Sequence, residues 1–192
     1  SDENFISAYP LVVNSINELY KKVKRECRRL SKMEFQSNNY YKQQIKLERL
    51  YGKINRKKEY FQYCEIKRIL KLCELFGYTY IAIEDLSISK MQQNKFHRAF
   101  NRQLTRLSWY GFTEKLTRKA KEYGIEVVKI DRYFASTKTC SKCGHKQKMK
   151  LSDRVYICNK CGFVEDRDIN AAKNIAKECT RALKENKKKL AK

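Results

Sequence analysis

Residues 139–175, TCSKCGHKQKMKLSDRVYICNKCGFVEDRDINAAKNI, contain two Cys-x-x-Cys-Gly motifs separated by 14 residues, followed by an Asp that opens an Ala-rich segment. The four thiols, at Cys140, Cys143, Cys158 and Cys161, have the paired spacing of a structural zinc site. Four Cys ligands complete a tetrahedral zinc site and leave no position open. A glycine follows each pair, where a tight turn around the metal favours a residue without Cβ. The stretch therefore predicts a four-Cys zinc ribbon.

A disulfide framework is the alternative use of these cysteines. The chain has 192 residues, contains 44 Lys and Arg, and has no apolar segment typical of a signal peptide. These features favour an intracellular protein, in which thiols stay reduced. We therefore interpret the four cysteines as zinc ligands.

The formal net charge of +23 is larger than solubility requires and favours a polyanionic partner. A membrane surface is one such polyanion. However, the basic residues are spread along the chain among 13 Tyr and 9 Phe and do not form one amphipathic anchor, and no run of about 18 apolar residues is present. Phosphates would neutralise the charge, and aromatic rings can stack on bases. We therefore predict DNA or RNA as partners, and no membrane.

The first half of the chain has helical periodicity. Apolar residues recur at steps of three and four over residues 14–33 and again over residues 40–76, with a break at 36–39 and a stop at Gly77. Lys and Arg occupy the opposite faces, so the pattern predicts a basic helical hairpin. Pro10 is expected ahead of the first helix, in an entry segment.

The second half predicts alternating strands and helices, beginning with a buried strand that delivers a carboxylate at its end. The order is strand, helix, strand and helix, which indicates a layered α/β domain. These elements are expected at residues 78–83, 94–123 with a break near Gly111, 125–130, and from Asp166 or Asp168 to Ala182. The charged tail from Lys184 onward is expected to fray.

Two carboxylates fall at the ends of predicted elements. Glu84 follows the first strand and Asp168 begins the last helix, so we expect both at the edge of one sheet. Hard oxygen ligands in such a position can hold the two magnesium ions that assist phosphodiester hydrolysis. Other interpretations stay open from the residues alone. A Glu after a strand is commonly a turn or salt-bridge residue, and an Asp at a helix start is commonly an N-cap.

Four segments carry a family resemblance. IAIEDLSISKM, ASTKTCSKCGHK, LSDRVYICNKCG and DRDINAAKNI, in this order, resemble the C-terminal RuvC-like half of TnpB proteins, which are transposon-encoded, RNA-guided DNA endonucleases related to type V CRISPR effectors. RRLSKMEFQSNNYYKQQIKLERLYGKI also resembles the helical region that follows the first RuvC motif of that family. The resemblance implies an α/β, RNase H-like (RuvC) fold that is incomplete at its first strand. It divides the chain into a basic helical hairpin region at 1–77, a RuvC-like core at 78–135, an inserted zinc ribbon at 136–164, and the last motif helix with its tail at 165–192.

The resemblance also assigns site residues. Glu84 matches the second catalytic acid of the family and Asp168 the third, both as magnesium ligands, and Arg154 in the LSDR motif matches a basic residue associated with the active site. An ordinary exposed loop arginine is the alternative for Arg154, and both interpretations stay open. The family's first catalytic Asp lies on an early strand in a G-x-D-x-G-like motif. This chain begins with SDENFIS, where Asp2 is a poor substitute because a terminus is seldom held rigidly.

Two functions are weighed. The first is the nucleic-acid-binding C-terminal portion of such an endonuclease, with DNA and guide RNA as partners, structural zinc and catalytic magnesium as cofactors, and a place at the nucleoid in a prokaryotic cytoplasm. We expect this chain alone to be inactive, because its first acid is lost or is supplied by a separate N-terminal polypeptide. The alternative is a non-catalytic DNA- or RNA-binding zinc-ribbon protein derived from that family. The retained Glu84 and Asp168 favour the first function.

Overall fold

The computed structural model describes the backbone of residues 8–86, 108–150 and 152–190, and the side chains of residues 14–86, 108–150 and 152–185. The chain divides into two compact units, Ser1–Lys71 and Leu72–Lys192. Each unit is described separately. No described helix combines the length and the apolar character needed to cross a membrane.

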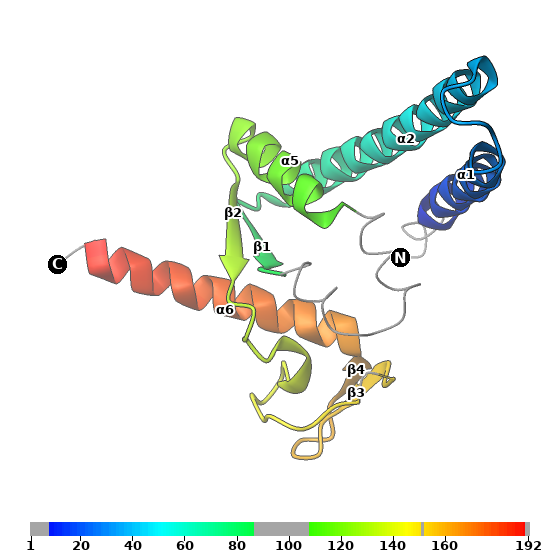
Figure 1. Cartoon of the computed structure of the whole chain (residues 1–192). Coiled ribbons are helices and arrows are strands. Elements are labelled where there is room, and N and C mark those ends of the chain that lie inside the picture. Colours follow the sequence, from blue (N-terminus) through cyan, green and yellow to red (C-terminus); the bar gives the residue numbers. More distant parts are fainter. Residues whose placement is uncertain (1–7, 87–107, 151, 191–192) are drawn as a thin grey trace. The chain divides into compact units, whose positions relative to one another are not determined.

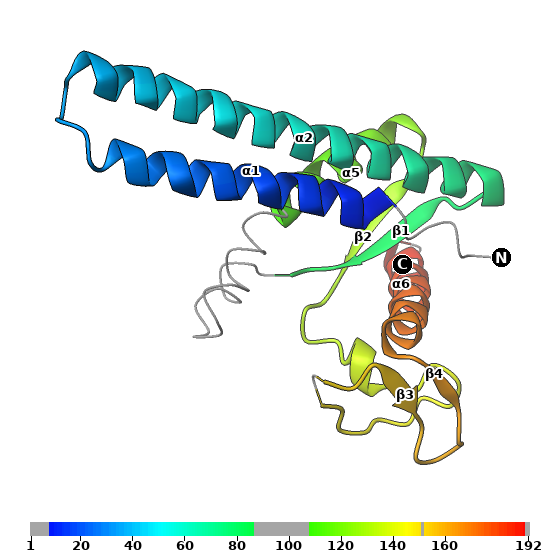
Figure 2. The same ribbon diagram turned by 90° about the vertical axis from the view of Figure 1, so that its right-hand side faces the viewer.

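The first unit is a helical hairpin of α1, Ala8–Leu30, and α2, Asn38–Phe76, which continues past the unit's last residue. Figures 1 and 2 show the two helices lying side by side and antiparallel. The predicted hairpin is therefore confirmed. Its core consists of apolar side chains from both helices, namely Ile16, Val23, Leu47 and Ile54, with Leu19, Tyr20, Leu30 and Leu50 packed against them.

The start of α1 differs from the prediction. Pro10 is the third residue of α1 and not part of a segment ahead of it. The first four backbone N–H groups of a helix have no partner within the helix, so a proline there removes no hydrogen bond. Ser37 precedes α2 and caps it. Its hydroxyl oxygen accepts a hydrogen bond from the Tyr40 N–H at 3.1 Å.

A buried carboxylate joins the two helices of the hairpin. Glu26 of α1 is 3% exposed and accepts hydrogen bonds from Gln43 Nε2 at 2.9 Å and Lys46 Nζ at 3.0 Å, both on α2. Arg29 Nη1 lies 3.2 Å from the same carboxylate. The Gln43 bond, followed by the Lys46 bond, lowers the pKa of Glu26 to about 2 despite its burial. Glu26 therefore stays ionised inside the hairpin.

The second unit contains a parallel pair of strands, β1 (Tyr80–Glu84) and β2 (Glu126–Ile130), with Glu84 opposite Ile130. Helix α5, Trp109–Glu122, contacts β2, and the long C-terminal helix α6, Arg167–Leu190, contacts both strands (Figure 1). Helix α5 runs through Gly111 without a break, and the expected helical residues 94–107 lie outside the described residues. Gly124, at φ +68°, follows α5 and has the left-handed conformation typical of the residue after a helix.

Two expectations for the second unit are wrong. Strand β1 is only partly buried, and Tyr80 is 39% exposed, because β2 is the only strand paired with β1 among the described residues. The C-terminal tail does not fray at Lys184, since α6 continues to Leu190. That part of the chain is rich in Lys, Glu and Leu, which are good helix formers.

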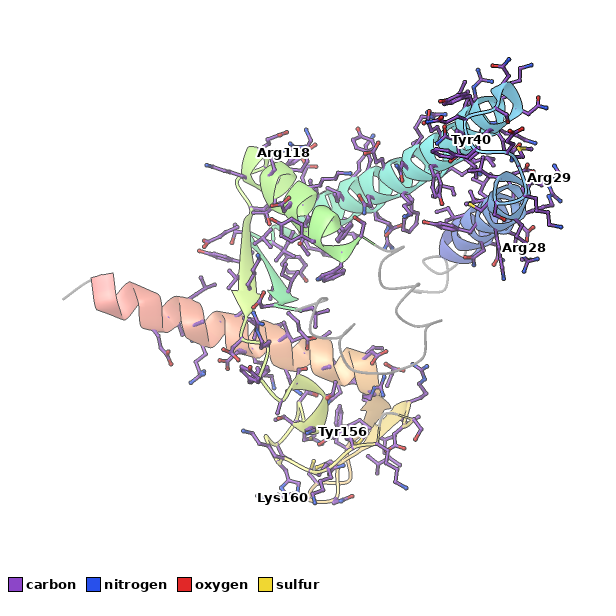
Figure 3. All side chains as sticks on the ribbon, in the orientation of Figure 1. Arg28, Arg29, Tyr40, Arg118, Tyr156 and Lys160 are labelled. Atoms are coloured by element: carbon purple, nitrogen blue, oxygen red, sulfur yellow. The ribbon has the colours of Figure 1, made fainter. Side chains whose placement is uncertain are left out.

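The cysteine-rich module lies between β2 and α6 in the sequence. It contains a 3-10 turn, η2, at Ser136–Lys138 and an antiparallel ribbon of β3 (Val155–Ile157) and β4 (Val164–Asp166). Tyr156 is fully buried between Cys140 and Cys158, and Figure 3 shows it inside the module, with Lys160 at the module's tip. Strand β4 ends at Asp166 and α6 begins at the next residue, so no loop separates them.

Candidate functional site

The four predicted cysteines converge on one point. All four Sγ atoms lie within 4.8 Å of one another, with Cys140 3.8 Å from Cys161 and Cys143 3.6 Å from Cys158. A tetrahedral site with metal–sulfur bonds of about 2.3 Å has sulfur–sulfur edges of about 3.8 Å. All four are free thiols. The cluster can therefore hold one tetrahedral metal ion without rearrangement.

The backbone around the cysteines repeats the same turn twice. In each motif the glycine N–H donates to the first Cys carbonyl at 2.9 Å, from Gly144 to Cys140 and from Gly162 to Cys158. Both glycines have positive φ, at 73° and 68°, which explains their place in the motif. Burial disfavours ionisation of the Cys158 thiol, but the backbone N–H groups of residues 160–161 outweigh it and lower the pKa to about 6. The turn thus favours the thiolate form of Cys158. At Cys161 the Phe163 backbone N–H is outweighed by burial and by the hydrogen bonds of the other thiols, which raise the pKa to about 12.

Helix α6 fastens the first cysteine turn through two buried asparagines. Asn170 donates to the Thr139 carbonyl and accepts the Ser141 N–H, both at 2.8 Å. Asn174, one turn later, donates to the Thr139 carbonyl at 2.7 Å and to the Ser136 carbonyl at 2.8 Å. Their relative exposures are 0% and 4%. The sequence analysis missed both residues, although an Asn pair four residues apart in an Ala-rich helix is a detectable signal.

Glu84 ends β1 and is half-buried. Its Oε1 atom accepts a hydrogen bond of 2.7 Å from the Ser136 hydroxyl. A salt bridge is the usual structural role of an acid at this position. Here the next residue, Asp85, forms it, with Arg132. Among the described residues, Glu84 forms no ion pair.

Asp168 lies in the first turn of α6 and its side chain is 69% exposed. It is not the N-cap of that helix. Asp166 caps α6, because its Oδ1 accepts the N–H groups of Asp168 at 2.8 Å and Ile169 at 3.1 Å. The only side-chain contact of Asp168 among the described residues is with Arg167 Nε at 3.2 Å. At the start of α6, Asp166 therefore caps the helix, and Asp168 remains as an exposed acid that takes no part in the cap.

Arg154 lies beside the same helix end. Its carbonyl accepts the Arg167 N–H at 2.8 Å, one step beyond the β3–β4 ladder, and its side chain is exposed. The structure brings Arg154 and Asp168 to one end of α6, and it connects Glu84 to α6 through Ser136 and Asn174. Among the described residues, the four-Cys cluster is the only group of three or more metal-binding side chains that lie together.

The other acids in this region have local roles. Asp131 Oδ1 accepts the Tyr133 N–H at 2.7 Å, and Asp153 Oδ2 accepts the Lys150 N–H at 3.0 Å. Both are acids that stabilise turns.

Comparisons with known proteins agree with these features. Residues 109–175 match the family model of the Cas12f1-like TNB domain. A TnpB-like protein of Acanthamoeba polyphaga mimivirus is 48% identical over 79 residues, which are 41% of this chain and 15% of that protein. The putative RNA-guided DNA endonuclease InsQ of Escherichia coli is 28% identical over 176 residues, which are 85% of this chain and 42% of InsQ. The chain thus spans less than half the length of these relatives, and the relatives are not confined to prokaryotes.

The chain is also similar to a solved structure. The Cas12f1 chain in a cryo-EM structure of a Cas12f1-sgRNA-target DNA complex has a TM-score of 0.60 to this chain at 26% identity, and the match covers 84% of this chain and 41% of that one. This similarity confirms the α/β fold, and the four-Cys cluster lies within the region that the family model matches. The chain is therefore a member of the TnpB family.

Proposed function

We propose that the chain is the nucleic-acid-binding C-terminal portion of a TnpB-like, RNA-guided DNA endonuclease associated with a transposon. One observation carries the nuclease part of the proposal. Glu84 does not form the salt bridge expected at the end of β1, because Asp85 forms it. Asp168 does not cap α6, because Asp166 does. Carboxylates at the ends of a strand and a helix that neither cap the helix nor form the salt bridge expected there can supply oxygen ligands to a metal ion.

The proposed architecture is a RuvC-like, RNase H-like fold in which β1 and β2 are part of a larger sheet. Parallel strands rarely form a sheet of two, and β1 has the apolar sequence of a strand that is covered on both faces. The domain boundaries proposed from the resemblance are 1–77, 78–135, 136–164 and 165–192.

Zinc is the metal we propose for the four-Cys cluster. Four thiolates at tetrahedral spacing match its preference, and no fifth ligand position is open. The site is then structural, and its part in function is to fix the module against α6. Metal analysis of the purified chain should give one zinc per chain.

Magnesium is the cofactor we propose at the acids. When bound, two magnesium ions would activate water and stabilise the leaving oxygen of a phosphodiester. Glu84 and Asp168 supply hard oxygen ligands, and Asp168 extends from a helix N-terminus, where the helix dipole stabilises its negative charge. Arg154, whose carbonyl accepts the Arg167 N–H, would neutralise a phosphate beside Asp168. The three-acid site of the family needs one more Asp, which we assign to a separate or preceding segment of polypeptide, so the 192 residues alone should not cleave DNA.

The partners we propose are DNA and a guide RNA, with the basic hairpin as a main contact surface. Most Lys and Arg side chains of α1 and α2 are exposed, and Figure 3 shows Arg28 and Arg29 at the hairpin's end. Exposed aromatic rings lie among them, at Phe35, Tyr41, Tyr60 and Tyr63. Such rings can stack on unpaired bases while the basic side chains contact phosphates. The proposed location is the nucleoid of a prokaryotic cell.

A binding measurement tests the nucleic-acid part. Fluorescence anisotropy of labelled single-stranded DNA, duplex DNA and RNA should give affinities that fall steeply with salt, with a log–log slope of about −0.7 to −0.9 per phosphate contacted. An affinity that does not change with salt would contradict the proposal.

A chimera tests the nuclease part. This chain replaces the matching C-terminal segment of the Escherichia coli relative, and DNA cleavage is measured with magnesium. Asp168→Asn should abolish cleavage. Asp166→Asn is the matched control and should retain it, because Asn caps a helix about as well as Asp. Equal loss in both variants would contradict a special role for Asp168.

The alternative is a non-catalytic DNA- or RNA-binding zinc-ribbon protein derived from the same family. The exposed Lys, Arg and aromatic side chains of the hairpin favour it, because they could bind nucleic acid without any cleavage. A chimera that binds DNA but never cleaves it would support this alternative. Magnesium-dependent cleavage by the 192-residue chain alone, abolished by Glu84→Gln, would contradict both functions.

A further inference from the structure

Ser136 connects the proposed magnesium ligand Glu84 to the cysteine module. The side chain of Ser136 is 4% exposed, and its hydroxyl donates to Glu84 Oε1 at 2.7 Å. Its carbonyl accepts from Asn174 Nδ2 at 2.8 Å. Ser136 is thus hydrogen-bonded to two elements: its hydroxyl to the last residue of β1, and its carbonyl to α6.

The serine is held firmly because its neighbours in the chain are also fixed. Thr139, three residues later, has its carbonyl bonded by both asparagines of α6, and the next residue is the metal-binding Cys140. The segment 136–140 therefore has no freedom to shift along α6. A hydroxyl on such a segment is a fixed donor, because the backbone that carries it cannot move without breaking buried hydrogen bonds.

We infer that Ser136 and Asn174 are positioning residues that orient the Glu84 carboxylate. A carboxylate at a strand end rotates freely about its last bond, and a single strong hydrogen bond to one oxygen selects one orientation. With Oε1 held by Ser136, Oε2 is the oxygen left to bind a metal ion. Asn174 acts one step further away, by fixing the Ser136 backbone. This inference rests on the proposed role of Glu84 as a magnesium ligand.

The experiment measures metal affinity without requiring cleavage. Mn²⁺, which has the ligand preference of Mg²⁺ and a strong electron paramagnetic resonance signal when free, is titrated into the zinc-loaded chimera with the Escherichia coli relative, because that chimera supplies the third acid of the site. Ser136→Ala should weaken Mn²⁺ binding by about 10- to 100-fold, as is typical when a hydrogen-bond partner of a metal ligand is removed. Ser136→Thr keeps the hydroxyl and should restore most of the affinity. Asn174→Ala should weaken binding in the same direction, by a smaller factor.

A matched control comes from another serine bonded to an acid. The Ser152 hydroxyl lies 3.4 Å from Asp153 Oδ1 in an exposed loop, and Ser152→Ala should leave the Mn²⁺ affinity unchanged. The zinc content of every variant is measured alongside. Should Ser136→Ala fail to retain zinc, Ser136→Thr and Asn174→Ala carry the test.

The outcomes separate the inference from the proposed function. Mn²⁺ binding that Glu84→Gln abolishes and Ser136→Ala weakens, with rescue by Ser136→Thr, supports the inference. Binding that depends on Glu84 but changes less than twofold in Ser136→Ala and Asn174→Ala overturns the inference and leaves the proposed function intact. Absent binding, or binding that Glu84→Gln does not affect, overturns the proposed magnesium site and with it the inference.

Discussion

Replacing Asn170 by alanine tests whether α6 holds the first cysteine turn in place. Asn170 is fully buried and bonds that turn twice, as a donor to the Thr139 carbonyl and as an acceptor from the Ser141 N–H, each at 2.8 Å. Asn170→Ala removes both bonds. The Thr139 carbonyl keeps a partner in Asn174, but the buried Ser141 N–H loses its own.

The expected loss of stability follows from these contacts. A buried donor left unpaired costs about 1–3 kcal/mol, and losing one of two bonds at the Thr139 carbonyl costs up to about 1 kcal/mol. Alanine is a better helix former than asparagine by about 0.6 kcal/mol, which offsets part of the loss. We expect the free energy of unfolding of the second unit to fall by about 1–3 kcal/mol.

The assay uses the only tryptophan of the chain. Trp109 lies in α5, within the second unit, so its fluorescence reports the unfolding of that unit. With a urea slope of about 2 kcal/mol per molar, a loss of about 1–3 kcal/mol lowers the midpoint by about 0.5–1.5 M. The zinc-loaded wild type and variant are compared at equal concentration.

Asn159→Ala is the matched control, because the side chain of Asn159 is exposed on the second cysteine turn. It should change the free energy of unfolding by no more than about 0.5 kcal/mol. If Asn170→Ala changes the free energy of unfolding no more than this control does, the buried asparagine does not hold the turn against α6. The inference that α6 positions Ser136 would then lose its support.

Three further predictions concern other buried groups. The pKa of Glu26 falls from 4.5 to about 2 on folding, so its contribution to hairpin stability is complete above pH 4.5 and is lost as pH falls toward 2. The midpoint of thermal unfolding, measured against pH, should therefore fall over this range, and Glu26→Gln should reduce that fall. Burial next to the cysteines raises the pKa of Tyr156 to about 12, and its hydroxyl has no hydrogen-bond partner in the part of the chain that the structure describes. Tyr156→Phe should therefore leave urea stability unchanged or raise it by up to about 1 kcal/mol, and a clear loss would mean that the hydroxyl is bonded. Cys158→Ser should abolish stoichiometric metal binding, measured by metal analysis, and retained metal would contradict the four-Cys site.

Much of the fold was predictable because its signals are local. The apolar periodicity of the hairpin and the β-branched strands at residues 80–84 and 126–130 lie within short windows of sequence. Two features that were not predicted depend on distant partners. The exposure of β1 depends on which strands flank it, and the burial of Glu26 depends on Gln43 and Lys46 of the other helix. No local pattern contains that information.

The same distinction applies to the site. The convergence of the four cysteines was predictable because two short motifs each fix a pair of ligands. The choice between Asp166 and Asp168 as the helix cap was open in the sequence, since an Asp suits either role. The structure assigns the cap to Asp166. Ser136 was not recognised, because its partner Glu84 is 52 residues away and serine before a cysteine motif has many uses.

The direct passage from β4 into α6 limits how this region can be rebuilt. With no residue between Asp166 and Arg167, the ribbon sets the rotation of the helix about its axis. One inserted residue at this junction would turn the helix by about 100° and advance it by about 1.5 Å, which would carry Asn170 and Asn174 away from the cysteine turn. Domain exchanges between family members should therefore keep residues 136–182 as one indivisible cassette, and cut the chain elsewhere.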